Sequence, residues 1–250
     1  MQTGIQISSL RPLLTDEARV RDAFFRVASL GCTHVQLQWI DRSVPVETIA
    51  DALRSAKLRS VSAQDLFDSV RADMDHYLRL NELTGGRWLC VSRVPDRFRT
   101  GDGLRRYVDE LRALTDAAAA RGQRVCFHPV AGDHAPVDGV CPVEYLLEMI
   151  PALQLCLDLY HLDRAGLSMT EWIGAHAGRI EMVHFKDARA GVLTPAGSGD
   201  INWDGVVGAC LKAGVRWAFV EQETWDGDPY KCLGEALEWL RGEIAACGRA

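Results

Sequence analysis

Apolar residues in this chain alternate between short continuous runs and longer stretches with helical spacing. Short apolar runs bounded by polar residues are typical of buried strands, whereas apolar positions spaced by three and four residues indicate helices. The repetition of this alternation predicts βα units and a parallel sheet. The eight expected strands cover residues 4–8, 34–38, 60–63, 88–92, 124–128, 154–158, 180–184 and 217–221.

The stretches between these strands carry helix start and stop signals. The first expected helix begins after Thr15 as its N-cap and stops near Gly31, and the last begins near Asp228. Eight strands with intervening helices in 250 residues match the size of an eightfold barrel, and no phosphate-binding glycine loop follows the first strand. We therefore predict one α/β domain over residues 1–250, a single (βα)8 TIM barrel.

Composition narrows the class of protein. Hydrophobic residues make up 48% of the chain and charged residues 25%, as in an average globular protein, and no apolar run is long enough to cross a membrane. The start of the chain lacks the pattern of a secretion signal, so we expect a cytoplasmic protein. The eight cysteines form no C-x-x-C pair and are interpreted as buried, reduced residues. A net charge of -6 without a long basic cluster argues against nucleic acid as a partner.

Polar side chains follow three of the late expected strands. Asp158 ends one apolar run, His184 lies at the end of the next, and Glu221 follows the last. Because the carboxyl ends of barrel strands converge on one face, we expect these three side chains to meet there. Two carboxylates and an imidazole suit Mn²⁺, Mg²⁺, Co²⁺ or Zn²⁺. The pattern thus predicts a metal site at the mouth of the barrel.

A fourth metal ligand is expected from the strand that precedes Asp158. The loop after residues 124–128 offers Asp133, and His128 and His134 are alternatives. All three residues lie at or just beyond the end of this strand, where they would face the same side of the barrel.

Four motifs in order carry a resemblance to a known family. They are L-D-L-Y-H at 157–161, V-H-F-K-D at 183–187, G-S-G-D-I-N-W at 197–203 and F-V-E-Q-E at 219–223. Together they resemble segments of the xylose isomerase-like barrel superfamily, the sugar phosphate isomerase/epimerase proteins. This superfamily includes ketose 3-epimerases, hydroxypyruvate isomerase and inosose dehydratase. The resemblance spans nearly the whole chain.

The resemblance implies a divalent metal ion held by a Glu, an Asp, a His and a second Glu. Asp158, His184 and Glu221 match three of these positions, and Asp133 stands where the family has its first Glu. The family's H-N-H-x-x-E segment corresponds here to residues 128–133, in which Val130 replaces the second His and the acid is one methylene shorter. The implied ligands are therefore Asp133, Asp158, His184 and Glu221, with Mn²⁺ as the preferred ion and Mg²⁺, Co²⁺ or Zn²⁺ as alternatives.

The chemistry of this family explains the need for such residues. Removing a proton from a carbon beside a carbonyl leaves an enediolate, whose charge a divalent cation stabilises. Carboxylates on both faces would give epimerisation, and one base on one face would give isomerisation. Glu221 is the first candidate for the base, with Glu223 as its neighbouring rival and Asp133 as its partner. Lys186 is expected to hold a substrate hydroxyl or an oxyanion, and His161 to contact the substrate or support a ligand.

We therefore expect a metal-dependent isomerase or epimerase of a small ketose, keto-acid or cyclitol. Its partners would be a small carbohydrate or keto-acid substrate, neither nucleic acid nor a membrane, and a homo-oligomer is possible. One alternative is a lyase of the inosose dehydratase type, and another is an inactive sugar-binding or regulatory barrel. A DNA-repair enzyme of the AP-endonuclease type would need more metal-binding residues and a basic face, which the acidic composition disfavours.

Overall fold

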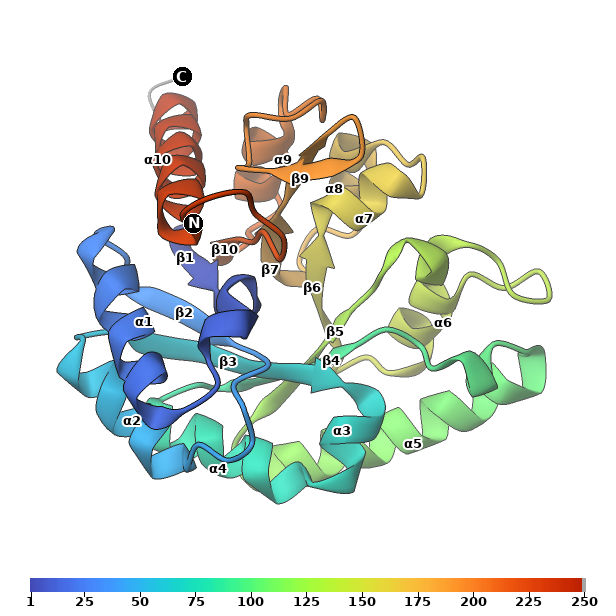
Figure 1. The fold of residues 1–250 in the computed structure, drawn as a ribbon. Coiled ribbons are helices and arrows are strands. Elements are labelled where there is room, and N and C mark those ends of the chain that lie inside the picture. Colours follow the sequence, from blue (N-terminus) through green and yellow to red (C-terminus); the bar gives the residue numbers. More distant parts are fainter. Residues whose placement is uncertain (249–250) are drawn as a thin grey trace.

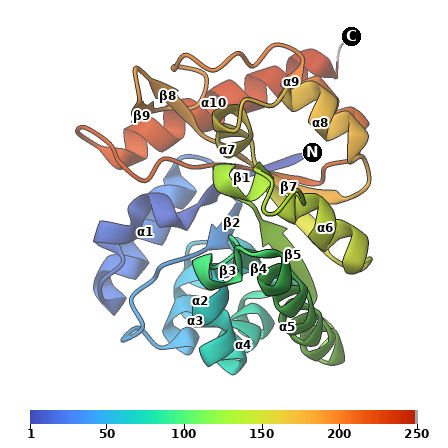
Figure 2. The same cartoon turned by 90° about the vertical axis from the view of Figure 1, so that its right-hand side faces the viewer.

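The computed structural model describes residues 1–248 and shows a closed barrel of eight parallel strands inside a ring of helices (Figures 1 and 2). This confirms the predicted (βα)8 barrel. Neighbouring strands follow one another in chain order, and the first pairs with the last to close the barrel. The barrel strands are β1 (Gln2–Gln6), β2 (His34–Leu37), β3 (Arg59–Leu66), β4 (Trp88–Ser92), β5 (Arg124–His128), β6 (Gln154–Asp158), β7 (Ile180–Phe185) and β10 (Trp217–Val220).

Helices occupy the outside of the barrel and several of the loops between strands. The α-helices are α1 (Glu17–Ser29), α2 (Val46–Ser55), α3 (Phe67–Ala72), α4 (Met74–Thr84), α5 (Gly101–Ala120), α6 (Pro142–Met149), α7 (Leu159–Arg164), α8 (Met169–Ala175), α9 (Val206–Lys212) and α10 (Pro229–Cys247). Three short 3-10 helices are η1 (Ile7–Leu13), η2 (Asp96–Phe98) and η3 (Ala131–His134). None of the helices within residues 1–248 is long and apolar enough to cross a membrane.

Several predicted boundaries differ from the structure, and two of the differences have clear local reasons. The first strand ends at Gln6, two residues before the expected end, because η1 begins at Ile7. The N-cap of α1 is Asp16 and not Thr15, since the Asp16 side chain accepts a hydrogen bond from the backbone N–H of Arg19. The start of α10 is as expected, with Asp228 as its N-cap.

The core has two apolar layers, one on each face of the barrel wall. The larger lies between the strands and the surrounding helices. The smaller fills the barrel interior and includes Cys90, Cys126, Cys156, Met182 and Phe219. All eight cysteines are free, and five of them are buried, so they pack as small apolar side chains.

A short hairpin, β8 (Asp187–Arg189) and β9 (Val192–Thr194), follows β7 and was not expected from the sequence. The fully buried carboxylate of Asp187 organises the turn that comes after it. It accepts hydrogen bonds from the backbone N–H of Gly197 at 3.1 Å and Gly199 at 3.0 Å, and from the indole of Trp203 at 2.9 Å. A Cβ at Gly199 would lie 2.0 Å from Asp187 Oδ1, so only glycine fits there. The acid that ends one motif thus holds the next motif in place.

We predict that Asp187→Ala lowers the free energy of unfolding by about 3 kcal/mol, because it leaves several buried N–H groups without an acceptor. Urea denaturation would measure the change. Asp204→Ala is the control, since this aspartate is exposed in the same segment and its replacement should cost less than about 0.5 kcal/mol. Equal stability of the two variants would contradict the role given to Asp187.

Candidate functional site

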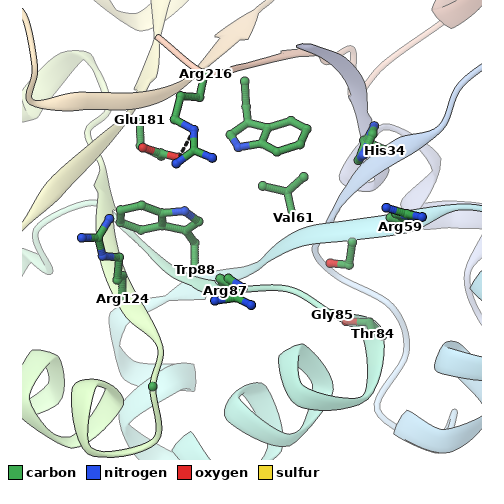
Figure 3. Close-up of a pocket in the computed structure, with 13 residues that line it drawn as sticks. His34, Arg59, Val61, Thr84, Gly85, Arg87, Trp88, Arg124, Glu181 and Arg216 are labelled. Atoms are coloured by element: carbon green, nitrogen blue, oxygen red, sulfur yellow. Dashed lines mark ion pairs between the residues drawn. The ribbon is translucent and has the colours of Figure 1, made fainter. Parts of the chain in front are cut away.

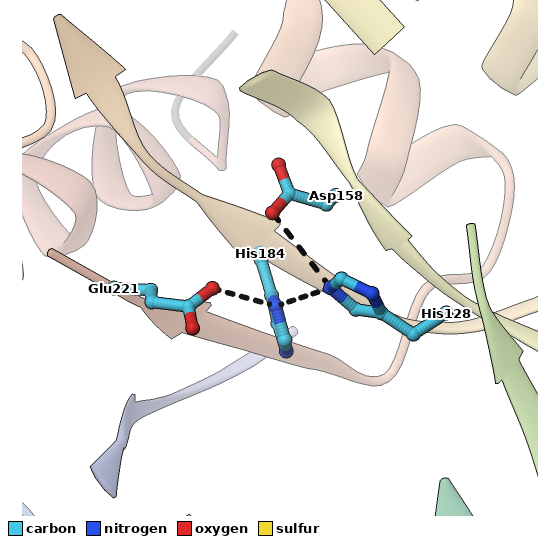
Figure 4. Close-up of side chains that lie close together, drawn as sticks. All are labelled: His128, Asp158, His184 and Glu221. Atoms are coloured by element: carbon cyan, nitrogen blue, oxygen red, sulfur yellow. Dashed lines mark hydrogen bonds and ion pairs between the residues drawn. The ribbon is translucent and has the colours of Figure 1, made fainter. Parts of the chain in front are cut away.

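Four side chains from consecutive barrel strands converge at the carboxyl-terminal mouth of the barrel (Figure 4). His128 ends β5, Asp158 ends β6, His184 lies near the end of β7, and Glu221 directly follows β10. All four are buried, and one nitrogen or oxygen atom of each lies within 4.8 Å of the others. Strand register explains part of this convergence, because Asp158 is the direct neighbour of His184 across β6 and β7.

The atoms that face one another are the imidazole nitrogens and one oxygen of each carboxylate. His184 Nδ1 lies 3.0 Å from Glu221 Oε2 and 3.1 Å from His128 Nε2. His128 Nε2 lies 3.7 Å from Asp158 Oδ2. In a tetrahedral metal site with bonds of about 2.1 Å, the ligand atoms lie about 3.4 Å apart. The observed separations therefore bracket the spacing of a metal coordination shell.

Hydrogen bonds from the helices that follow β1 and β6 hold the outer oxygens of the two carboxylates. Glu221 Oε1 accepts from the hydroxyl of Ser8 at 2.7 Å. Asp158 Oδ1 accepts from the backbone N–H of His161 at 3.1 Å and so caps α7. Each carboxylate is therefore fixed through one oxygen, and the other oxygen is directed toward the centre of the cluster.

Gln36 orients the imidazole of His184. Its side-chain amide donates to Gln64 Oε1 at 2.7 Å, which leaves Gln36 Oε1 to accept from His184 Nε2 at 2.6 Å. When Nε2 carries the proton, the lone pair of a neutral His184 is on Nδ1, the atom that faces the cluster. Such a hydrogen bond on the far nitrogen is typical of histidines that bind metals.

The inward carboxylate oxygens provide a direct test of whether a metal ion fits. Asp158 Oδ2 and Glu221 Oε2 are buried, yet neither accepts a hydrogen bond within residues 1–248. Buried oxygens of this kind are normally hydrogen-bonded or bound to a cation. Two imidazole nitrogens and two carboxylate oxygens form a donor set that suits Zn²⁺, Mn²⁺ or Co²⁺. The residues of the cluster therefore fit a divalent ion.

Lys186 provides a positive charge beside the same oxygens. Its buried ammonium nitrogen lies 3.3 Å from Asp158 Oδ2 and 3.2 Å from Glu221 Oε2. Burial raises the pKa of Asp158 and of Glu221, but Lys186 and the neighbouring histidines together outweigh burial and hold the pKa of both carboxyl groups well below the usual range. Burial lowers the pKa of Lys186, but the surrounding carboxylates raise it by more than burial lowers it, so the group stays charged.

Glu223 has the opposite character to Glu221. Lys186 donates to its carboxylate at 2.7 Å, and its side chain remains partly exposed. Burial and the neighbouring charge of Glu221 both raise the pKa of Glu223. The pKa values of two carboxyl groups on the same short segment are thus moved in opposite directions, which is a common arrangement for acid–base pairs.

Asp133 is not brought to this cluster, contrary to the sequence-based expectation. Its fully buried carboxylate accepts from Arg99 at 2.5 Å and from the backbone N–H groups of Val94 at 3.2 Å and Val130 at 2.9 Å. It therefore joins the loops after β4 and β5. In the turn of η3 one oxygen of Asp133 accepts from the backbone N–H of Val130, the N-cap of that turn, and Arg99 binds the other oxygen. His128, the alternative from the same strand, occupies the fourth position.

The other two candidate histidines lie beside the cluster. His161 is in the first turn of α7, and its Nε2 is 3.9 Å from Asp158 Oδ2. His134 packs edge-on against Trp172, with ring centroids 5.4 Å apart. Neither ring nitrogen of His134 has a hydrogen-bond partner among the described residues, and burial lowers the pKa of His134 to about 4. His161 is thus near enough to support Asp158, whereas His134 is a buried neutral side chain.

Sequence reasoning missed the residues that support the cluster. Gln36 and Gln64 could have been found, since each is a polar residue inside an apolar strand. Ser8 and Arg99 gave no such signal, because a serine at the end of an expected strand and an arginine in a loop are ordinary features. Their roles depend on contacts with Glu221 and Asp133, which are more than 30 residues away in each case.

Comparison with known proteins places this fold and site in a family. The sequence profile described as "Xylose isomerase-like TIM barrel" matches residues 17–243. The chain therefore belongs to the xylose isomerase-like TIM barrel family, as its motifs suggested. No sequence among the curated proteins matches the chain at a significant level.

Solved structures with the same fold include several sugar-metabolising enzymes. A sugar phosphate isomerase/epimerase from Parabacteroides distasonis superimposes with a TM-score of 0.80 at 16% identity, covering 98% of this chain and 94% of that one. A D-allulose 3-epimerase from Methylomonas sp., solved with D-allulose, gives 0.73 at 17% identity, with 97% and 96% covered. A probable 3-DHS dehydratase from Bacillus anthracis superimposes with a TM-score of 0.73 at 15% identity, covering 96% of this chain and 99% of that one. At these identities the likeness shows a shared fold.

We predict that His128→Ala lowers the amount of Mn²⁺ retained after dialysis at least about tenfold, since it removes one of four donor atoms. Asp133→Asn is the matched comparison and should retain the metal, because Asp133 lies outside the cluster. Elemental analysis of the folded variants measures both. Metal loss in Asp133→Asn with retention in His128→Ala would reverse the assignment.

A second prediction concerns pH and His134. Its pKa in the folded protein, about 4, lies below the ordinary value of 6.5, so the unfolded chain binds the proton first as the pH falls. The contribution of neutral His134 to the free energy of unfolding is complete above pH 6.5 and is lost progressively down to pH 4, by up to about 3 kcal/mol. His134→Gln lacks this contribution, so the stability difference between wild type and variant should change across this interval. A stability difference between the two proteins that stays constant in urea denaturation from pH 7 to pH 4 would contradict the shift.

Proposed function

We propose that the protein is a divalent-metal-dependent sugar isomerase or epimerase acting on a small ketose, keto-acid or cyclitol. The observation that carries this proposal is the convergence of two imidazole nitrogens and two inward-facing carboxylate oxygens at the mouth of the barrel. Active sites of (βα)8 enzymes lie at this face. Membership in the xylose isomerase-like family supports the same class of reaction.

His128, Asp158, His184 and Glu221 would hold the metal ion. When bound, such an ion stabilises negative charge on neighbouring substrate oxygens. The chain already concentrates buried carboxylates here, and these outnumber the single ammonium group of Lys186. An additional positive charge would therefore be favourable at this position.

Glu221 is the proposed base that removes the proton beside the substrate carbonyl. Ser8 fixes one of its oxygens, and its lowered pKa keeps it ionised at neutral pH. A base must be deprotonated and correctly oriented before the reaction, and Glu221 meets both conditions. Lys186 can donate to the substrate oxygen on which charge develops, because its ammonium group lies beside Glu221.

Glu223 is the proposed partner that returns a proton. Asp133 was the sequence-based candidate for this role, but its carboxylate is held by Arg99 and two backbone N–H groups. Glu223 contacts Lys186 and has a raised pKa, so it binds a proton more readily than Glu221. An acid and a base with pKa values moved in opposite directions suit a reaction that removes and returns a proton.

The dehydratase alternative uses the same first step. After proton removal, loss of a neighbouring hydroxyl as water would give a lyase in place of an isomerase. The probable 3-DHS dehydratase that shares this fold supports a lyase as the second candidate function. The products differ, since a lyase yields one equivalent of water and a new double bond.

We predict that a screen of ketoses, keto-acids and inososes in deuterated buffer with Mn²⁺ identifies a substrate that gains deuterium at the carbon beside its carbonyl. Glu221→Gln should slow this exchange at least about 100-fold, because the amide cannot accept the proton. Proton NMR measures the exchange, and rates are compared per bound metal ion because Glu221 is also a proposed ligand.

Glu238→Gln, an exposed change on α10, is the control and should leave exchange unchanged. Exchange by Glu221→Gln at the wild-type rate would remove this residue as the base. A chain that binds Mn²⁺ but exchanges no member of the panel would favour a sugar-binding barrel without catalysis.

A further inference from the structure

A second cavity lies at the opposite end of the barrel, around the amino-terminal ends of the strands (Figure 3). Its volume is about 780 Å³, within the range of small-molecule sites. The residues that line it come from the starts of six barrel strands and the loops before them. None of them belongs to the metal cluster.

Four arginines surround this cavity because each lies at or directly before the start of a barrel strand. Arg59 and Arg124 are the first residues of β3 and β5, and Arg87 and Arg216 directly precede β4 and β10. Backbone hydrogen bonds between neighbouring strands hold these positions. The N–H of Arg124 donates to the carbonyl of Arg87 at 2.9 Å, and the N–H of Arg216 to that of Glu181 at 3.1 Å. The guanidinium groups are thus carried by the rigid end of the sheet.

Two tryptophans form the apolar part of the cavity. Each follows an arginine directly, as Arg87-Trp88 and Arg216-Trp217. Both indoles, with Val61, line the cavity and pack onto the apolar layer inside the barrel. In Figure 3 the side chains of Arg87, Arg124 and Arg216 lie around Trp88. Aromatic faces beside guanidinium groups suit a ligand that has both a flat ring and a negative charge.

The charges of the cavity are poorly balanced. Only Arg216 has an ion-pair partner among residues 1–248, the nearly buried Glu181 at 3.6 Å. The side chains of Arg59, Arg87 and Arg124 contact no carboxylate within 4.0 Å in that part of the chain. Four guanidinium groups against one carboxylate give a positive cavity in a chain whose net charge is -6. Such a local reversal of charge attracts anions.

The cavity and the metal cluster are separated by the interior of the barrel. The side chains of Cys90, Cys126, Cys156, Met182 and Phe219 fill the space between the two ends. A five-residue strand is about 16 Å long, so a small ligand cannot span both sites. Binding at the amino-terminal end would therefore leave the metal cluster accessible.

We propose that this cavity binds a small phosphate monoester with a flat aromatic ring. The phosphate would take hydrogen bonds from the arginines that lack a carboxylate partner, since guanidinium groups bind phosphate through paired donors. The ring would lie against Trp88 and Trp217. This proposal does not depend on the function proposed for the metal cluster.

Isothermal titration with 1-naphthyl phosphate tests the proposal, with inorganic phosphate and 1-naphthol as partial ligands. We expect binding below about 1 mM for the complete probe and at least about tenfold weaker binding of each part. The titration is carried out with chelator present, so that a bound metal ion cannot supply the phosphate site. No heat at about 1 mM probe, or equal affinity for inorganic phosphate, would overturn the proposal.

Arg59→Gln and Arg87→Gln should each weaken binding of the probe at least about fivefold, since each removes a charged donor. Both arginines are exposed, so the fold should tolerate the change. Arg106→Gln, exposed on α5, is the control and should leave the affinity unchanged. Equal affinities in all three variants would exclude this cavity as the binding site.

Fluorine NMR of protein labelled with 5-fluorotryptophan locates the ligand independently. The signals of Trp88 and Trp217, assigned with Trp→Phe variants, should shift on addition of the probe. The signal of Trp225 should not, because its indole donates to Ser9 at the other end of the barrel. A shift confined to Trp225 would place the ligand at the metal end and contradict the proposal.

Discussion

Each carboxylate and imidazole of the central cluster has two polar atoms, and in three of the four residues a group outside the cluster holds the outer one by a hydrogen bond. Ser8 holds one oxygen of Glu221, the start of α7 holds one oxygen of Asp158, and Gln36 holds Nε2 of His184. The inner atoms are thereby directed at one another, and the two inner carboxylate oxygens lie beside the buried ammonium group of Lys186. This geometry presents four donor atoms to one point, which supports the proposal that a divalent cation binds there.

The fold was predictable because the pattern that defines it is local. Alternating apolar runs and helical stretches reported the eight strands, and β4, β5 and β6 have the expected bounds. The features that the sequence did not predict depend on local interactions. The 3-10 helix at Ile7 shortens β1, and the hairpin of β8 and β9 forms around the buried carboxylate of Asp187. Neither arrangement produces a periodic apolar signal in the sequence.

The site was predictable as far as strand ends determine it. Asp158, His184 and Glu221 meet because their strands run in parallel to the same face. The fourth position was decided by tertiary contacts. Arg99, 34 residues before Asp133 in the chain, pairs with its carboxylate and removes it from the cluster, while His128 fills the position from the end of its own strand. Spacing along the sequence could not distinguish an acid in the loop from an imidazole on the strand.

The most direct test of the central claim is a crystal structure of the protein with Mn²⁺, with anomalous scattering to locate the ion. The account predicts one strong anomalous peak within about 2.3 Å of His128 Nε2, Asp158 Oδ2, His184 Nδ1 and Glu221 Oε2. A peak bound by Asp133, or no peak among these four side chains in crystals saturated with Mn²⁺, would contradict it.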